Sequence, residues 1–177
     1  VDGGGGVARR LTVDAGTATA ILQGEVGGNS PLADLDVTAA NIQLGADIAV
    51  DAAGGNGVTF SGDVLLTGNV SIDTDRASSP DYSVTFGGLV DADNATANNR
   101  SLTINAGTAF VDFLGEIGTK SAGSLHFLDV TANEIRLRGR VIADDAGGAT
   151  TFFRGDVVLL GNVSIDVERT GVATHNH

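Results

Sequence analysis

The sequence predicts an all-β protein whose chain winds into a parallel β-helix, also called a β-solenoid. Two observations lead to this prediction: the sequence repeats itself with a period of about 91 residues, and each long repeat contains a shorter period typical of one β-helical coil. The composition agrees, because the apolar residues are mostly Val, Ile, Leu and Ala, alongside 26 Gly and only 2 Pro. Such a mixture favours short strands joined by tight turns.

The long repeat relates residues 35–73 to residues 128–166, which are identical at 22 of 39 positions. Upstream, residues 11–27 and 102–118 are identical at 9 of 17 positions. The offset between the copies grows from 91 to 93 residues, because the second copy has two extra residues in one loop.

The two copies predict one continuous solenoid of two units. Residues 1–101 form the first unit, and residues 102–177 form the second, which we expect to be truncated at its last rung. Residues 1–13 resemble the segment that begins at Val90 in the first unit, whereas the second unit stops shortly before its own copy of that segment would begin. We therefore expect the chain to be part of a longer array of repeats.

The short period appears as similar strand openings spaced by 24, 23, 26, 18, 26 and 22 residues, close to one turn of a parallel β-helix. These openings lie at Leu11, Leu35, Val58, Val84, Leu102, Leu128 and Thr150. We expect four rungs in each unit and about seven in the chain. Alternation along the strands predicts one inward ladder of apolar side chains, formed by Val13, Val37, Phe60, Phe86, Ile104, Val130 and Phe153.

The alternative architecture is a pair of tandem immunoglobulin-like sandwiches, which also have about 100 residues each. The short period and the absence of Trp favour the solenoid.

Composition also limits the partners of the chain. A net charge of −12 argues against nucleic acid, because phosphate backbones are bound through Lys and Arg. No stretch approaches the run of about 20 apolar residues that spans a bilayer, so no membrane insertion is expected. The chain has no Cys, which leaves neither disulfides nor thiolate metal sites. The charge is uneven, since residues 11–99 carry −11 and residues 100–171 carry −2.

Several segments resemble the repeats of giant bacterial surface proteins of the filamentous-haemagglutinin-like and β-strand-repeat adhesin type. They are SGDVLLTGNVSID, SVTFGGLVD, LTINAGTAFVDFLGEIG and SLHFLDVTANEIRL, and the resemblance extends from about Leu11 to Val167. It implies a right-handed β-helix that is secreted and forms the shaft of a rod or fibre at the cell surface.

Two acidic turns are candidates for calcium. Asp73 and Asp75, and Asp91 and Asp93, place oxygen ligands at alternate positions, as calcium loops do. Neither turn continues into an EF-hand or a calcium β-roll nonapeptide. The alternative is that these side chains cap their own solvated turns. We expect no other cofactor.

Arg136, Arg138 and Arg140 alternate along one predicted strand, and Arg154 lies at a matching outward position about one rung further on. This basic stripe predicts an anion or sulfated-glycan surface, or a contact with an acidic neighbouring rod. The alternative is a solvated strand face that discourages edge pairing.

No catalytic residues are expected, because no nucleophile elbow, P-loop or other catalytic motif is present. The sequence therefore predicts a structural or adhesive segment of a long extracellular or cell-surface rod, whose partners are neighbouring repeats or subunits end to end. Two alternatives remain: a subunit that assembles into a filament by stacking end to end, or a β-helix that binds host or matrix glycans.

Overall fold

The computed structural model describes residues 1–4, 9–51, 53–76, 80–93, 100–120, 123–143 and 151–167. Within these residues the protein has strands and turns and no helix. The strands are β1 (Arg10–Leu22), β2 (Asp34–Leu44), β3 (Ile48–Ala49), β4 (Gly57–Leu66), β5 (Val70–Asp73), β6 (Val84–Phe86), β7 (Val90–Ala92), β8 (Leu102–Asn105), β9 (Phe110–Phe113), β10 (Leu128–Leu137), β11 (Val141–Ile142), β12 (Phe152–Leu159) and β13 (Ile165–Asp166).

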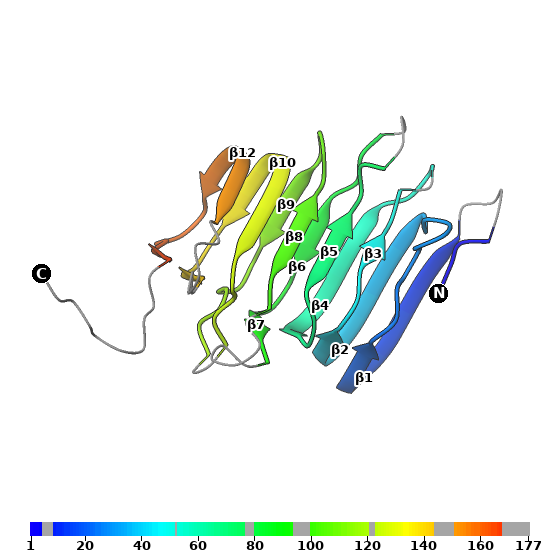
Figure 1. Ribbon diagram of the computed structural model, residues 1–177, viewed down its shortest axis with the longest axis horizontal. Helices are drawn as coiled ribbons and strands as arrows, with labels where there is room; N and C mark the ends of the chain where they lie inside the picture. The colour runs from blue at the N-terminus through cyan, green and yellow to red at the C-terminus, as the bar shows by residue number, and fades with distance from the viewer. Residues whose placement is uncertain are drawn as a thin grey trace, which may run out of the picture.

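All the strand pairs are parallel, and the chain forms a β-solenoid, as predicted. The solenoid has about six turns, where the sequence predicted about seven rungs. Figure 1 shows the strands side by side along the long axis, from β1 near the N-terminus to β12 near the opposite end. Each coil has three straight segments, and each segment pairs with the corresponding segment of the next coil. We call the three resulting stacks face A, face B and face C.

The register of the strand pairs defines the faces. Face A stacks Leu11, Leu35, Val58, Val84, Val111, Ile135 and Val157. Face B stacks Ala20, Ile42, Val64, Val90, Ile117, Val141 and Ile165. Face C stacks Val26, Ile48, Ile72, Ile104, Val130 and Phe153.

Alternate residues of each strand point into the tube, and they form one continuous apolar core. On face A the core contains a stack of three aromatic rings. The centroids of Phe60 and Phe86 lie 5.3 Å apart, and those of Phe86 and Phe113 lie 5.1 Å apart. All three rings are fully buried.

The long repeat is not a whole number of turns. Leu11 lies on face A of the first coil, whereas its equivalent Leu102 lies on face C three coils later. The first unit therefore covers three and two-thirds turns, where the sequence predicted four rungs. Equivalent residues of the two units consequently lie on different faces of the solenoid.

This offset divides the inward ladder that the sequence predicted. Val13, Val37, Phe60 and Phe86 do stack on face A, but the next residue in that stack is Phe113 and not Ile104. Ile104, Val130 and Phe153 stack on one another on face C. The residues of the single predicted ladder therefore belong to two ladders, one on face A and one on face C.

Candidate functional site

The predicted basic stripe is divided between two faces. Arg136 lies on the part of β10 that forms face A, where its cross-strand partners are Asp112 and Val158. Arg154 lies on face C opposite Thr131, so it is not one rung above Arg136. The reason is the same offset, because β10 and β12 in the second unit run from face C to face A.

Three of the four arginines are paired with carboxylates of the same or the neighbouring coil. Arg136 donates to Glu134, Arg138 to Asp112 and Arg154 to Asp129. Two of the guanidinium groups also lie over aromatic rings, at 4.2 Å from the centroid of Phe110 for Arg136 and 4.3 Å from that of Phe152 for Arg154. The fourth, Arg140, is exposed.

Pairing reduces the charge that this surface offers to an anionic ligand. An arginine already bound to a carboxylate must lose that partner or share it, and the pair as a whole carries no net charge. The geometry therefore supports the solvated-strand interpretation better than a sulfated-glycan surface.

The first pair of predicted calcium ligands lies beside two more polar side chains. The Asn105 amide donates to Asp73 Oδ1 at 3.4 Å and to Asp75 Oδ2 at 3.3 Å, so an N–H group occupies the space between the two carboxylates. Burial, together with repulsion from Asp81, raises the pKa of Asp75. Hydrogen bonds from Thr108 lower the pKa of Asp81.

The second pair of predicted ligands is separated by its partners. Asp93 forms a bidentate pair with Arg100, at 2.8 and 3.0 Å. The carboxylate of Asp91 is buried; its Oδ1 accepts the backbone N–H of Lys120 at 3.1 Å, and its Oδ2 lies 3.6 Å from Lys120 Nζ. Burial raises the pKa of Asp91, and the contacts with Lys120 oppose this effect.

Asp91 anchors a corner loop, and the same arrangement occurs at Asp2. The Asp2 carboxylate accepts the backbone N–H and the side-chain amide of Asn29, each at 3.0 Å, and Asn29 is the equivalent of Lys120 in the repeat. The backbone bonds match as well, since Gly27 N donates to Val1 O and Gly118 N donates to Val90 O. This role was not predicted from the sequence, although the recurring Val-Asp pair signals it.

Among the described residues, no group of three or more His, Cys, Asp or Glu side chains is arranged to hold a metal ion. Calcium binding stays a prediction. Thermal melting with and without a chelator tests it, and an unchanged melting temperature would exclude structural calcium.

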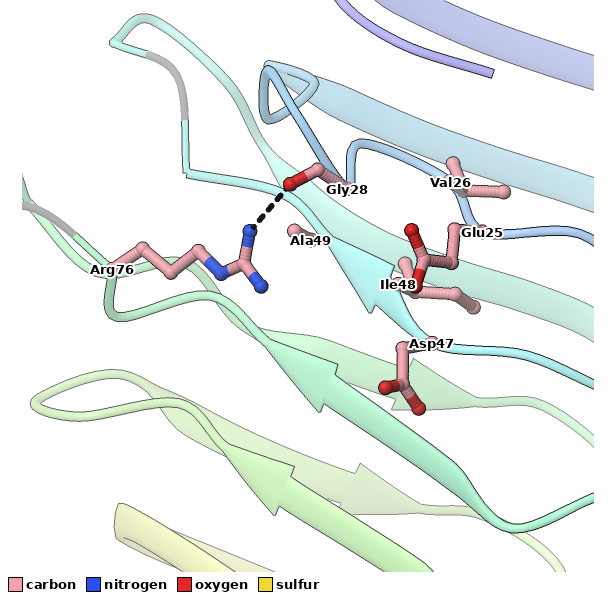
Figure 2. A pocket seen from close by; sticks show the side chains of 7 residues that line it. All are labelled: Glu25, Val26, Gly28, Asp47, Ile48, Ala49 and Arg76. Atoms are coloured by element: carbon pink, nitrogen blue, oxygen red, sulfur yellow. Dashed lines mark hydrogen bonds between the residues drawn. The ribbon is translucent and has the colours of Figure 1, made fainter.

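One small pocket lies at a corner of the first three coils (Figure 2). Glu25 and Asp47 lie on one side of it and Arg76 on the other, where Arg76 Nη1 donates to Gly28 O at 3.3 Å. Arg76 Nε also donates to Asp73. The volume of about 70 Å³ has room for about two water molecules, so the pocket is too small for a substrate.

No protein-family model, curated protein or solved structure matches the chain. The resemblance to bacterial surface repeats therefore stays a prediction. Within the part of the chain that the structure describes, no helix is long and apolar enough to cross a membrane.

Proposed function

We propose that this chain is a structural segment of a long extracellular rod or fibre, in which stacked coils provide length and stiffness and no reaction is catalysed. The observation that carries the proposal is the open coil at the C-terminal end of the solenoid. Phe152, Val157, Leu159, Leu160, Ile165 and Val167 are all exposed there.

The repeat itself indicates what covers this end. Val157, Leu159 and Ile165 are 43, 58 and 49% exposed, respectively, whereas their equivalents in the first unit are at most 1% exposed. These equivalents are Val64, Leu66 and Ile72, which are covered by Val90, Ala92 and Ile104 of the following coil. A further coil of the same repeat would therefore bury the exposed row and pair with the edge of β12 that no described strand occupies.

A chimaera tests this inference. Residues 1–166 are followed by a second copy of residues 74–105, which is the segment that covers the equivalent coil in the first unit. We expect a higher melting temperature and weaker binding of a hydrophobic dye than in the natural chain. The control carries Asp at the added copies of Val84, Val90 and Ile104. Equal melting temperatures for the chimaera, its control and the natural chain would contradict the proposal.

The location and length of the rod need a separate experiment. We expect an antiserum raised to this chain to detect, in whole source cells, a protein far larger than 17.8 kDa that is removed by protease treatment of intact cells. A protease-resistant band of 17.8 kDa would contradict a surface rod.

The second candidate function is a subunit that stacks end to end. It is favoured by the opposite end of the solenoid, where the core-facing side chains of Leu11 and Val13 in β1 are only half-buried. In this case, sedimentation velocity would show oligomers that grow with concentration, and Leu159→Lys would abolish them. A natural chain that stays monomeric at every concentration would exclude the subunit and leave the rod segment unaffected.

A further inference from the structure

A polar groove crosses the outer side of face C. It has a volume of about 270 Å³ and is lined by Asp47, Asn69, Val70, Ser71, Ser101, Thr103 and Phe127. These residues come from four successive coils, so the groove runs along the solenoid axis. Three steps of about 4.8 Å between coils give it a length of about 14 Å.

The floor of the groove offers hydroxyl groups. Ser71 lies in β5 and Thr103 in β8, where the flanking residues Val70, Ile72, Leu102 and Ile104 are buried in the core. Alternation along the strands therefore points Ser71 and Thr103 outwards. Among the described residues, neither hydroxyl has a hydrogen-bond partner.

The two sides of the groove are held in place by backbone hydrogen bonds. Asp47 Oδ1 accepts the N–H of Ser71 at 2.8 Å, and Asn69 Oδ1 accepts the N–H of Ser101 at 3.1 Å. Each side chain is thus fixed by one oxygen, and its other polar atom remains to contact a ligand. A fixed site loses less conformational entropy on binding than a mobile one.

An aromatic ring closes one end of the groove. Phe127 is half-buried, and its ring centroid lies 5.8 Å from that of His126 in an edge-on contact. The equivalent residue in the first unit is Asp34, so the repeat itself does not require an aromatic residue there.

We propose that this groove binds a neutral oligosaccharide. One sugar ring would stack its C–H face on Phe127, and hydroxyl groups of the saccharide would bond to Asp47, Ser71 and Thr103. The hydroxyl groups of a saccharide can both donate and accept hydrogen bonds. They therefore suit a groove that offers a carboxylate, which only accepts, and hydroxyl groups, which do both.

Charge and size select the class of ligand. The groove is lined by one carboxylate and no Lys or Arg, in a chain of net charge −12, so sulfated and uronic sugars are repelled. The volume lies just below the range of about 300–1,000 Å³ for typical ligand sites. This size suits one ring in the deepest part, with the saccharide continuing along the axis.

The test uses the full chain and saturation-transfer NMR with cellotriose, maltotriose, lactose, diacetylchitobiose and a heparin disaccharide. We expect at least one neutral probe to bind and the heparin disaccharide not to bind. Phe127→Ala should weaken binding about tenfold, as expected for the loss of an aromatic contact. Phe152→Ala, which removes an exposed ring outside the groove, should leave binding unchanged.

A second pair of variants keeps the test valid if Phe127→Ala unfolds the chain. Ser71→Val removes a hydroxyl and fills the floor while keeping a strand-forming residue. Its matched control is Ser164→Val, at the equivalent position of the second unit. We expect loss of binding only for Ser71→Val. The proposal is overturned if no neutral probe binds, if Ser71→Val and Ser164→Val bind equally, or if the heparin disaccharide binds in place of the neutral probes.

Discussion

Gly62 and Gly155 are equivalent residues at which a strand bends from one face to the next. Their φ angles are 153° and 155°, and a Cβ atom would lie 1.9 Å from the carbonyl oxygen of Ala39 or Ala132 in the adjacent coil. Neither position can hold a side chain without moving the backbone of its neighbour. The close stacking of coils thus depends on glycine at the bends.

We expect Gly62→Ala to lower the free energy of unfolding by about 3 kcal/mol, through backbone strain and the contact with Ala39 O. Gly16→Ala is the control, because Gly16 also has a positive φ of 53° but no atom of the described chain lies within 4 Å of its added Cβ. It should cost about 1 kcal/mol. Urea denaturation measures both, and equal losses would contradict the steric argument.

Asp91 should make stability depend on pH in the direction opposite to most carboxylates. Its pKa is raised in the folded chain by burial, so the unfolded chain ionises first as the pH rises. The contribution of Asp91 to stability is therefore greatest below pH 3.8 and falls as the pH rises through the raised pKa.

Asp91→Asn should remove this loss of stability with rising pH, while it keeps the side-chain oxygen that accepts the N–H of Lys120. We expect the variant to gain stability relative to the natural chain between pH 3 and pH 7, as measured by urea denaturation at each pH. The range of about 3 to 7 spans the reference pKa of Asp and the region above it. Asp2→Asn is the control, since hydrogen bonds from Asn29 lower the pKa of Asp2 and give the opposite sign. A difference that does not vary with pH would contradict the argument.

At the scale of the strand, position along the solenoid decides how much a core residue contributes. Phe60 and Phe153 are equivalent residues, but Phe60 in β4 is covered by β6, whereas Phe153 lies in β12 at the open end. Phe60 is fully buried and Phe153 is half-buried.

We expect Phe60→Ala to lower the free energy of unfolding by about 3–5 kcal/mol, and Phe153→Ala to lower it by less than half as much. The larger loss comes from a cavity enclosed between two coils, while the site at the open end is already in contact with water. Thermal denaturation of both variants checks this. Equal losses would show that another segment covers the end coil.

The sequence predicted the parallel β-helix because the apolar alternation and the strand openings are local signals. The offset between units also left a signal, since the interval of 18 residues from Val84 to Leu102 is too short for a full coil and corresponds to two-thirds of one. The partners of the arginines were not predictable. Arg138 meets Asp112 only because β9 and β10 are adjacent on face A, and adjacency depends on that same offset.

At the scale of the whole molecule, each coil is stabilised mainly by the coil on either side of it. We expect amide hydrogen exchange to be slowest in β4, β8 and β9, which have neighbours on both sides. Exchange should be fastest in the end strands β1 and β12, which among the described strands pair only with β2 and β10, respectively. Exchange measured by mass spectrometry on peptides from each strand checks this order. Uniform protection would indicate a single cooperative unit without fraying at its end.

The unit of three and two-thirds turns determines the symmetry of any rod built from it. Each unit advances about 18 Å along the axis and turns equivalent residues by one-third of a revolution, so three units complete eleven turns in about 53 Å. Fibre diffraction from such a rod would show a threefold screw superposed on the spacing between coils. Each loop or groove that occurs once per unit would point in three directions in succession along the rod. Such a rod would therefore present the same features on all its sides, and it could contact a partner from any direction around its axis.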